Sequence, residues 1–110
     1  MYRRKVFGEA GETLAAIYLQ EKGFKILERN YSTKAGELDI IAAKNGILHF
    51  IEVKTRSSGK YGKPEEAVDE KKLEKMERAA LLYRAKNHPP FDYESMDVIA
   101  ITLDFLEGVM

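Results

Sequence analysis

Residues 36–56, GELDIIAAKNGILHFIEVKTR, contain two β-rich runs separated by a short polar turn. The runs cover residues 37–43 and 47–55, and an Asn-Gly pair between apolar runs is the strongest short-range signal for a β-hairpin. In an antiparallel hairpin the numbers of opposite residues have a constant sum, and a turn closed by Lys44 and Ile47 sets that sum at 91. The sequence therefore predicts a hairpin of defined register.

This register brings acidic side chains together. Asp39 falls opposite Glu52, and Glu37 falls opposite Lys54. Because residues two apart share a face of a strand, all four are expected on one side of the hairpin. Two carboxylates with Cβ atoms about 5 Å apart repel each other by roughly 3 kcal/mol at an effective dielectric constant of 20. The cluster therefore requires a compensating charge, from Lys54 or from a divalent cation.

A divalent cation would give this cluster a chemical role. Mg²⁺ or Mn²⁺ takes oxygen ligands from one or two carboxylates and keeps open positions for water and phosphate oxygens. Asp39 and Glu52 would bind the metal, and Lys54 would orient or deprotonate the attacking water. The alternative interpretation is a surface charge network, because 33% of the residues are charged. The apolar residues Ile41 and Phe50, the next pair on the acidic side, favour a partly buried site.

The flanking sequence predicts the rest of an α/β domain. A helix is predicted over residues 5–22, with Gly23 as a left-handed cap at its end and an apolar stripe at Phe7, Ala10, Leu14, Ile17 and Tyr18. Alternation over residues 24–31 predicts a half-exposed strand near a sheet edge, followed by a turn at residues 32–36. A polar, glycine-rich loop follows Thr55. A second helix is expected from Pro64 to the His88-Pro89-Pro90 break, with a buried stripe at Leu73, Met76, Ala80 and Tyr83. Residues 97–105 predict a strand covered on both faces.

Length and composition limit the class of protein. The chain has 110 residues, 45% of them hydrophobic, which predicts a single domain over residues 1–110. It has neither a run of roughly 18 apolar residues nor a signal peptide, so a cytoplasmic protein without membrane contact is expected. The absence of cysteine excludes disulfides and thiolate sites. The 18 Lys and Arg balance the 18 Asp and Glu, so attraction to nucleic acid would have to come from a local basic surface.

The basic residues are clustered along the chain. One group begins at the end of the hairpin and consists of Lys54, Arg56, Lys60 and Lys63; a second lies between residues 71 and 78, where glutamates are interleaved; a third, at the start of the sequence, consists of Arg3, Arg4 and Lys5. The second group is interpreted as a solvated helix face with salt bridges. His49 falls on the face opposite Glu52, and His88 lies in the proline break, so both are interpreted as structural.

Three blocks of sequence resemble the YraN-like family of uncharacterised bacterial proteins: GEAGETLAAIYLQEKGFKILERNY, GELDIIA and FIEVKTRSSGKYGKPEEAV. That family resembles the PD-(D/E)XK nuclease superfamily. The resemblance implies a restriction-endonuclease-like, three-layer α/β core in the order helix, three strands, helix, strand, with a mixed central sheet. Asp39 takes the position of the metal-binding Asp, and Glu52 and Lys54 take those of the E-x-K element.

The same resemblance suggests further site residues. Glu12 resembles an additional metal-side glutamate of the resolvase branch, although a solvent-facing helix position is an equal alternative. Glu37 departs from the simplest pattern, and its role as an extra ligand or as a partner behind the ligands stays open.

The expected function is a metal-dependent nuclease acting on branched or single-stranded DNA, more than on RNA, with Arg56, Lys60 and Lys63 holding the strand. The alternative is a non-catalytic module that binds nucleic acid or protein and keeps the nuclease fold. Because related nucleases are often dimers, the resemblance also implies a homodimer as one oligomeric state to expect.

Overall fold

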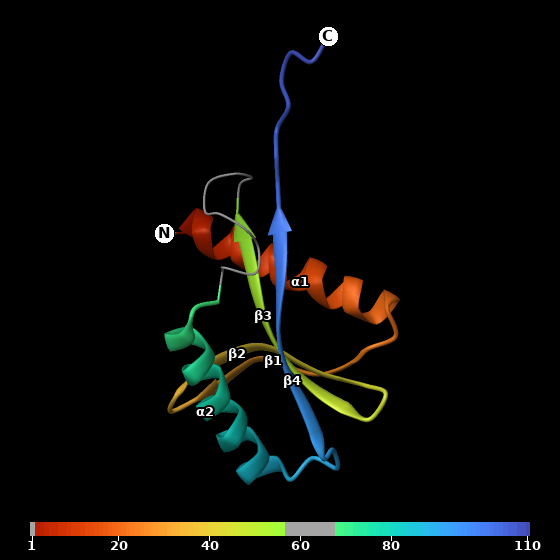
Figure 1. The fold of residues 1–110 in the computed structure, drawn as a ribbon. Coiled ribbons are helices and arrows are strands. Elements are labelled where there is room, and N and C mark those ends of the chain that lie inside the picture. Colours follow the sequence, from red (N-terminus) through yellow and green to blue (C-terminus); the bar gives the residue numbers. More distant parts are fainter. Residues whose placement is uncertain (1, 57–67) are drawn as a thin grey trace.

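The computed structural model describes residues 2–56 and 68–110 as an α/β fold. Figure 1 shows the order of its elements, which is the order predicted from the sequence. They are α1 (Tyr2–Glu21), β1 (Lys25–Thr33), β2 (Gly36–Lys44), β3 (Ile47–Arg56), α2 (Glu70–Asn87) and β4 (Tyr93–Thr102).

The four strands form one mixed sheet in the order β1-β2-β3-β4. The first three strands are antiparallel neighbours, whereas β4 runs parallel to β3. The two helices cover opposite faces of the sheet (Figure 1): Ala15, Ala16 and Leu19 of α1 pack with Ile40 and Ile51, while Met76, Ala79 and Tyr83 of α2 pack with Leu38 and Phe50. This arrangement confirms the predicted three-layer core.

The β2–β3 hairpin has the predicted register. Lys44 pairs with Ile47, and the ladder continues to Ile40 opposite Ile51. Asn45 and Gly46 have φ values of 52° and 76°, the left-handed conformation that a two-residue hairpin turn requires. Ile41 and Phe50 pair as expected, and both are fully buried. The local turn chemistry therefore determined the alignment of the two strands.

The structure corrects the face of α1 that meets the sheet. Leu14, Ile17 and Tyr18 follow helical spacing, but all three are about half exposed. The sheet is instead contacted by small residues, Gly11 and Ala15 among them, and by Leu19. Small side chains allow a helix to approach a sheet closely. The side of α1 with the small residues is therefore the one that packs on the sheet, and the larger apolar residues are left about half exposed.

Gly11 lies where α1 packs directly against Thr55 of β3. A Cβ atom added at this position would overlap Thr55 Cγ2, whereas a Cβ added at Gly8 meets nothing within 4 Å. We expect Gly11→Ala to lower the free energy of unfolding by about 1 to 3 kcal/mol through overpacking, and Gly8→Ala to raise it by about 0.5 to 1 kcal/mol through helix propensity. Urea denaturation measures both. Adding Thr55→Ser, which removes the methyl group, should restore much of the loss; equal stability of the two alanine variants would contradict the close approach.

The second helix begins later than predicted. Asp69 is its N-cap, with a carboxylate that accepts a hydrogen bond from the Lys72 backbone N–H at 2.8 Å. Pro64, Glu65 and Glu66, expected in the first turn, lie outside the described residues. Met76, Ala80 and Tyr83 are buried as predicted, but Leu73 is 36% exposed and Ala79 takes its place in the core. His88 ends the helix in the left-handed conformation, so the break was correctly predicted.

The last strand also differs from the prediction. β4 covers Tyr93–Thr102 rather than residues 97–105, and it lies at the edge of the sheet, so it is only partly buried. Leu103 and Phe105 continue into an exposed tail that leaves the body of the protein (Figure 1). A run of apolar residues does not distinguish an edge strand from a central one. Within the described ranges, neither helix is long and apolar enough to span a membrane.

Candidate active site

Asp39 lies at the point where β2 and β3 separate. The ladder ends at the pair Ile40 and Ile51, so Asp39 has no partner across β3. Its carboxylate instead accepts a hydrogen bond from the Val53 backbone N–H at 2.8 Å. The Asp39 carboxylate thus accepts a hydrogen bond from β3 at a point where the backbone ladder has ended, and it lies between β2 and β3. A carboxylate in this position is rigid and partly withdrawn from solvent.

Glu52 approaches Asp39 from the neighbouring strand. The electrostatic repulsion between the two carboxyl groups, and their direct contact, both act on Asp39. The two residues predicted to face each other therefore lie close together, although the ladder ends before them and they do not form a ladder pair. We call Asp39 and Glu52 the acidic pair. Glu52 has a second partner that the sequence did not indicate: Lys72 Nζ of α2 lies 3.1 Å from Glu52 Oε2.

The pKa of Asp39 is raised from its ordinary value to about 7. Burial is the largest cause, because it disfavours the charged form, and the nearby charges of Glu52 and Glu12 act in the same direction. The hydrogen bond from Val53 opposes the shift. At neutral pH the side chain is therefore close to half protonated. A carboxyl group in this state can lose its proton to solvent when it binds a cation.

Glu12 belongs to the side of α1 that faces the sheet, not to the solvent side. It is partly buried, its charge acts on Asp39, and burial raises its pKa, against the effect of a hydrogen bond with Asn30. Its sheet-facing position follows from the correction to α1, since Gly11 and Ala15 flank it on the buried side. The alternative of a solvent-facing glutamate is wrong.

Glu37 does not share a face with Glu52, and its predicted pairing with Lys54 is wrong. The β2–β3 ladder stops before it, and Glu37 pairs with Ser32 of β1 instead. Leu38 packs on the α2 side and Ile40 on the α1 side, so the alternation of faces breaks at Asp39. Glu37 consequently lies with Glu12 in a polar hollow that is also lined by Lys5, Gly8, Glu9 and Asn30.

The basic residues predicted around the site occupy different settings. Lys54 is exposed and lies on the Glu52 side of β3 by strand alternation, and Arg56 at the end of β3 is partly buried. Lys60 and Lys63 lie outside the described residues. Lys72 contacts Glu52 of the acidic pair. The sequence placed it in a solvated helix face, and only the packing of α2 on the sheet brings it to Glu52.

The two histidines lie away from the acidic pair. His49 Nδ1 lies 2.5 Å from Asp97 Oδ2, which links β3 to β4, and its ring packs edge-on against Phe24. Ser95 donates to the other oxygen of Asp97. His88 provides the left-handed residue that ends α2. Both positions agree with a structural role.

The acidic pair suits a cation that requires only two protein carboxylates. Among the residues that the structure describes, no three Asp, Glu or His side chains gather closely enough to form a complete metal cluster. Mg²⁺ commonly binds through one or two carboxylates, with water and phosphate oxygens in the other positions. Asp39 and Glu52 would be the direct ligands, and the nearby charge of Glu12 would favour the cation.

Removing the Lys72 side-chain charge tests how the acidic pair is balanced. We expect Lys72→Gln to lower the free energy of unfolding by about 1 kcal/mol, because Glu52 is 14% exposed and loses its cationic partner, while Lys72 itself remains partly solvated. Lys71→Gln removes the same charge from an exposed neighbour and is the matched control. Urea denaturation at low ionic strength measures both. Equal stability of the two variants would mean that the ion pair contributes nothing.

The fold and the site together define an α/β protein with a restriction-endonuclease-like core and a pair of partly buried acidic side chains where two strands separate. The model of an uncharacterised protein family, UPF0102, matches residues 11–101. The chain belongs to this family.

Curated relatives support the assignment. A UPF0102 protein of Syntrophomonas wolfei is 50% identical over 95 residues, covering 86% of this chain and 82% of the relative. One from Alkaliphilus metalliredigens is 49% identical over 82 residues, covering 74% and 72%. A third, from Caldanaerobacter subterraneus, is 42% identical over 101 residues, covering 92% and 83%. The confirmed family is the YraN-like family to which the three sequence blocks pointed.

Proposed function

We propose that this protein is a divalent-metal-dependent nuclease that hydrolyses phosphodiester bonds of branched or single-stranded DNA. The observation that carries the proposal is the acidic pair: Asp39 is held by the Val53 N–H in contact with Glu52, and its pKa is raised to about 7. Two repelling carboxylates in a partly buried position destabilise a fold, and a bound cation would offset that cost. Strongly shifted carboxyl groups in such settings are candidates for functional sites.

The residues around the pair have distinct expected roles. Mg²⁺ or Mn²⁺ would supply a Lewis acid and a water of lowered pKa. Asp39 and Glu52 would bind the ion, with Glu12 adding negative charge from α1, and Lys54 on the Glu52 side of β3 would orient the attacking water. Arg56, at the end of the same strand, would contact phosphate, as would Lys60 and Lys63. A homodimer would allow two strands to be cut and stays a prediction.

One observation favours the alternative of a non-catalytic nucleic-acid-binding or protein-interaction module. Lys72 already neutralises Glu52 at a distance of 3.1 Å, so one member of the acidic pair is balanced without a metal. In a nuclease, Lys72 would either leave Glu52 when the metal ion binds or remain paired with Glu52 next to the metal ion. In a non-catalytic module it would be a permanent structural link between α2 and the sheet.

Cleavage assays distinguish the two functions. Purified protein is incubated with plain duplex, single-stranded, flapped and branched DNA, and with single-stranded RNA, in Mg²⁺, Mn²⁺ or EDTA. We expect metal-dependent products from at least one DNA substrate that contains unpaired or branched strands. Asp39→Asn protein, purified in parallel, controls for contaminating nucleases. Identical products from both preparations, or no products in either metal, would overturn the nuclease proposal.

A further inference from the structure

The charged residues of α2 are separated onto two sides of the helix. Lys71, Lys75 and Arg78 recur at intervals of four and three residues, and continuing the same spacing leads to Leu82 and Lys86. Glu70, Glu74 and Glu77 recur at the same intervals on the other side of the exposed surface. The interleaved sequence therefore forms two stripes of opposite charge, not one evenly mixed face. The pair Arg78 and Glu74, 3.9 Å apart, bridges the boundary.

The basic stripe borders the β1–β2 turn. Lys34 and Ala35 of the turn line a shallow hollow together with Arg78 and Leu82. Next to it lies an open groove of about 540 Å³, lined by Tyr31, Ser32, Thr33, Lys34, Leu82 and Lys86. We call the cations Lys71, Lys75, Arg78, Lys86 and Lys34 the basic flank. The acidic stripe instead lies toward β4, where Arg84 Nε contacts Glu94 at 2.6 Å.

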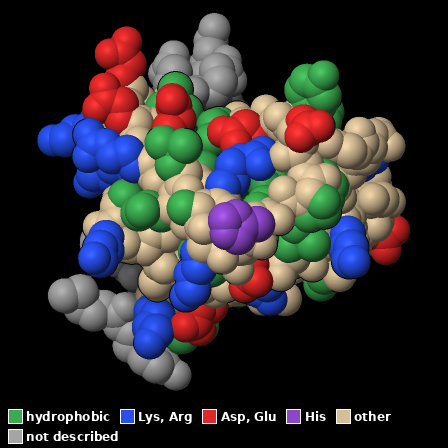
Figure 2. Space-filling model, turned by 90° about the horizontal axis from the view of Figure 1, so that it is seen from below, with side chains coloured by type: hydrophobic (Ala, Val, Ile, Leu, Met, Phe, Trp, Pro, Cys, Tyr) green, Lys and Arg blue, Asp and Glu red, His purple; other side chains and the backbone are tan. Residues whose placement is uncertain are grey.

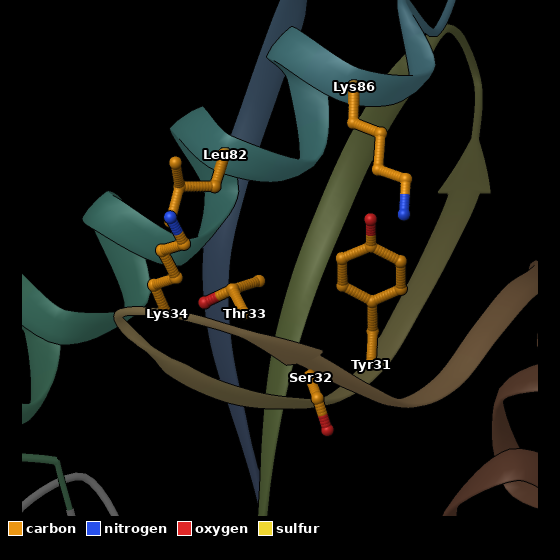
Figure 3. A pocket seen from close by; sticks show the side chains of 6 residues that line it. All are labelled: Tyr31, Ser32, Thr33, Lys34, Leu82 and Lys86. Atoms are coloured by element: carbon orange, nitrogen blue, oxygen red, sulfur yellow. The ribbon is translucent and has the colours of Figure 1, made fainter.

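The groove combines cations with apolar and aromatic surface. Figure 3 shows the Lys86 ammonium group pointing toward the Tyr31 hydroxyl, and Lys34 extending beside Leu82 on the other side of the opening. The Tyr31 hydroxyl also accepts a hydrogen bond from Asn87 Nδ2 at 3.1 Å, and its ring packs edge-on against Tyr83. The ring is thus fixed in place. Ammonium groups suit phosphates, and a fixed aromatic ring with an exposed leucine suits unpaired bases.

The helix that carries most of the basic flank also carries Lys72, the partner of Glu52 in the acidic pair. Lys72 lies between the basic stripe and the buried side of α2 and contacts Glu52, whereas Lys86 lines the groove at the other end of the helix. Positions 72 and 86 are separated by about 21 Å along the helix axis, which corresponds to roughly six stacked nucleotides of one strand. On the face of the molecule shown in Figure 2, basic, acidic and hydrophobic side chains are mixed.

We propose that the basic flank binds single-stranded nucleic acid, with phosphates at Lys34 and Lys86 and a base against Tyr31 and Leu82. The strand would extend along α2 toward the acidic pair, and this direction rests on the proposed nuclease function. The acidic stripe on the opposite side repels phosphates and confines the strand to one side of the helix. A duplex is excluded from the groove because its bases are stacked inside the double helix and cannot pack against Tyr31 and Leu82.

Fluorescence anisotropy with a labelled twelve-nucleotide oligo-dT tests the binding surface. All titrations use the Asp39→Asn background in EDTA, which keeps the oligonucleotide intact. The test variant is Lys34→Gln/Lys86→Gln; the matched control is Lys22→Gln/Lys25→Gln, which removes two exposed lysines at the opposite end of β1. We expect the test pair to weaken binding at least tenfold and to reduce the slope of log K against log salt by about 1.4, at ~0.7 for each lost phosphate contact. The control pair should change binding less than twofold, and thermal melts verify that both remain folded.

The outcomes separate this proposal from the nuclease. Equal losses for both lysine pairs, no binding of the oligonucleotide, or an equal loss for a blunt duplex would overturn the basic flank as a single-strand site. If the wild-type background cleaves DNA and the Lys34→Gln/Lys86→Gln variant cleaves it equally well at low substrate concentration, the nuclease stands and the basic flank is wrong. If the test pair selectively loses binding but no cleavage is ever observed, the binding surface stands and the nuclease is wrong.

Discussion

Asp39→Asn is expected to abolish metal-dependent cleavage, by at least a thousandfold, and to stabilise the metal-free protein at the same time. The asparagine side-chain oxygen can still accept the hydrogen bond from Val53 N–H, so the local geometry is kept. What is lost is the negative charge beside Glu52. A shift of the Asp39 pKa from 3.8 to about 7 corresponds to at most about 4 kcal/mol, which partial access of solvent reduces to about 1 to 2 kcal/mol.

The difference in free energy of unfolding between Asp39→Asn and the wild type should increase as the pH rises. The folded state raises the pKa of Asp39, so it binds this proton more tightly than the unfolded chain does. The contribution is fully favourable below pH 3.8 and is lost as the pH rises toward 7. We therefore expect the free energy of unfolding of Asp39→Asn, relative to that of the wild type, to rise progressively between pH 4 and 7. Above pH 7 the difference should stay constant.

Urea denaturation of both proteins from pH 4.5 to 8.5, in EDTA, measures this difference. Glu37→Gln is the matched control, since it removes a neighbouring carboxylate on β2 that faces the α1 side instead of Glu52. A destabilised Asp39→Asn protein would show that the carboxylate is a structural partner. It would remove the physical basis of the proposed metal site.

Metal affinity should rise steeply with pH up to about 7. A cation bound by Asp39 must displace its proton, so each unit of pH below the pKa reduces the competent fraction tenfold. We expect the affinity for Mn²⁺ to increase by about fiftyfold between pH 5 and 7, and by about a hundredfold in all before it levels off near pH 8. Isothermal titration calorimetry in buffers of different ionisation enthalpy measures both the affinity and the proton released.

Glu12→Gln sharpens that experiment. The charge of Glu12 raises the Asp39 pKa, so its removal should shift the midpoint of the pH dependence to lower values. At pH 6 the variant would then release fewer protons on binding metal than the wild type does. A pH-independent affinity in the wild type would mean that Asp39 is not a ligand.

The sequence by itself determined the elements whose signals are local. The Asn45-Gly46 turn sets the register of the hairpin, because two successive residues that readily adopt the left-handed conformation close a two-residue turn between the strands. The register in turn predicts that Asp39 and Glu52 are neighbours. The helix ends near Gly23 and His88 were predictable for the same reason, since the end of a helix depends on residues within one turn of it.

The tertiary structure decided which surfaces face each other. Small residues at Gly11 and Ala15 bring α1 close to β3, and this turns Glu12 toward the sheet and the larger apolar residues toward solvent. The local break in β2 separates Glu37 from the acidic pair. Neither feature follows from periodicity, because periodicity identifies the faces of an element but not the face that packs.

Lys72 illustrates the same limit at the candidate site. In the sequence it belongs to a run of alternating charges, which favours a solvated helix. Its contact with Glu52 depends on where α2 crosses the sheet, and that position is fixed by the packing of Met76, Ala79 and Tyr83. Charge patterns are local properties of the chain, whereas an ion pair between distant elements is created only when the core assembles.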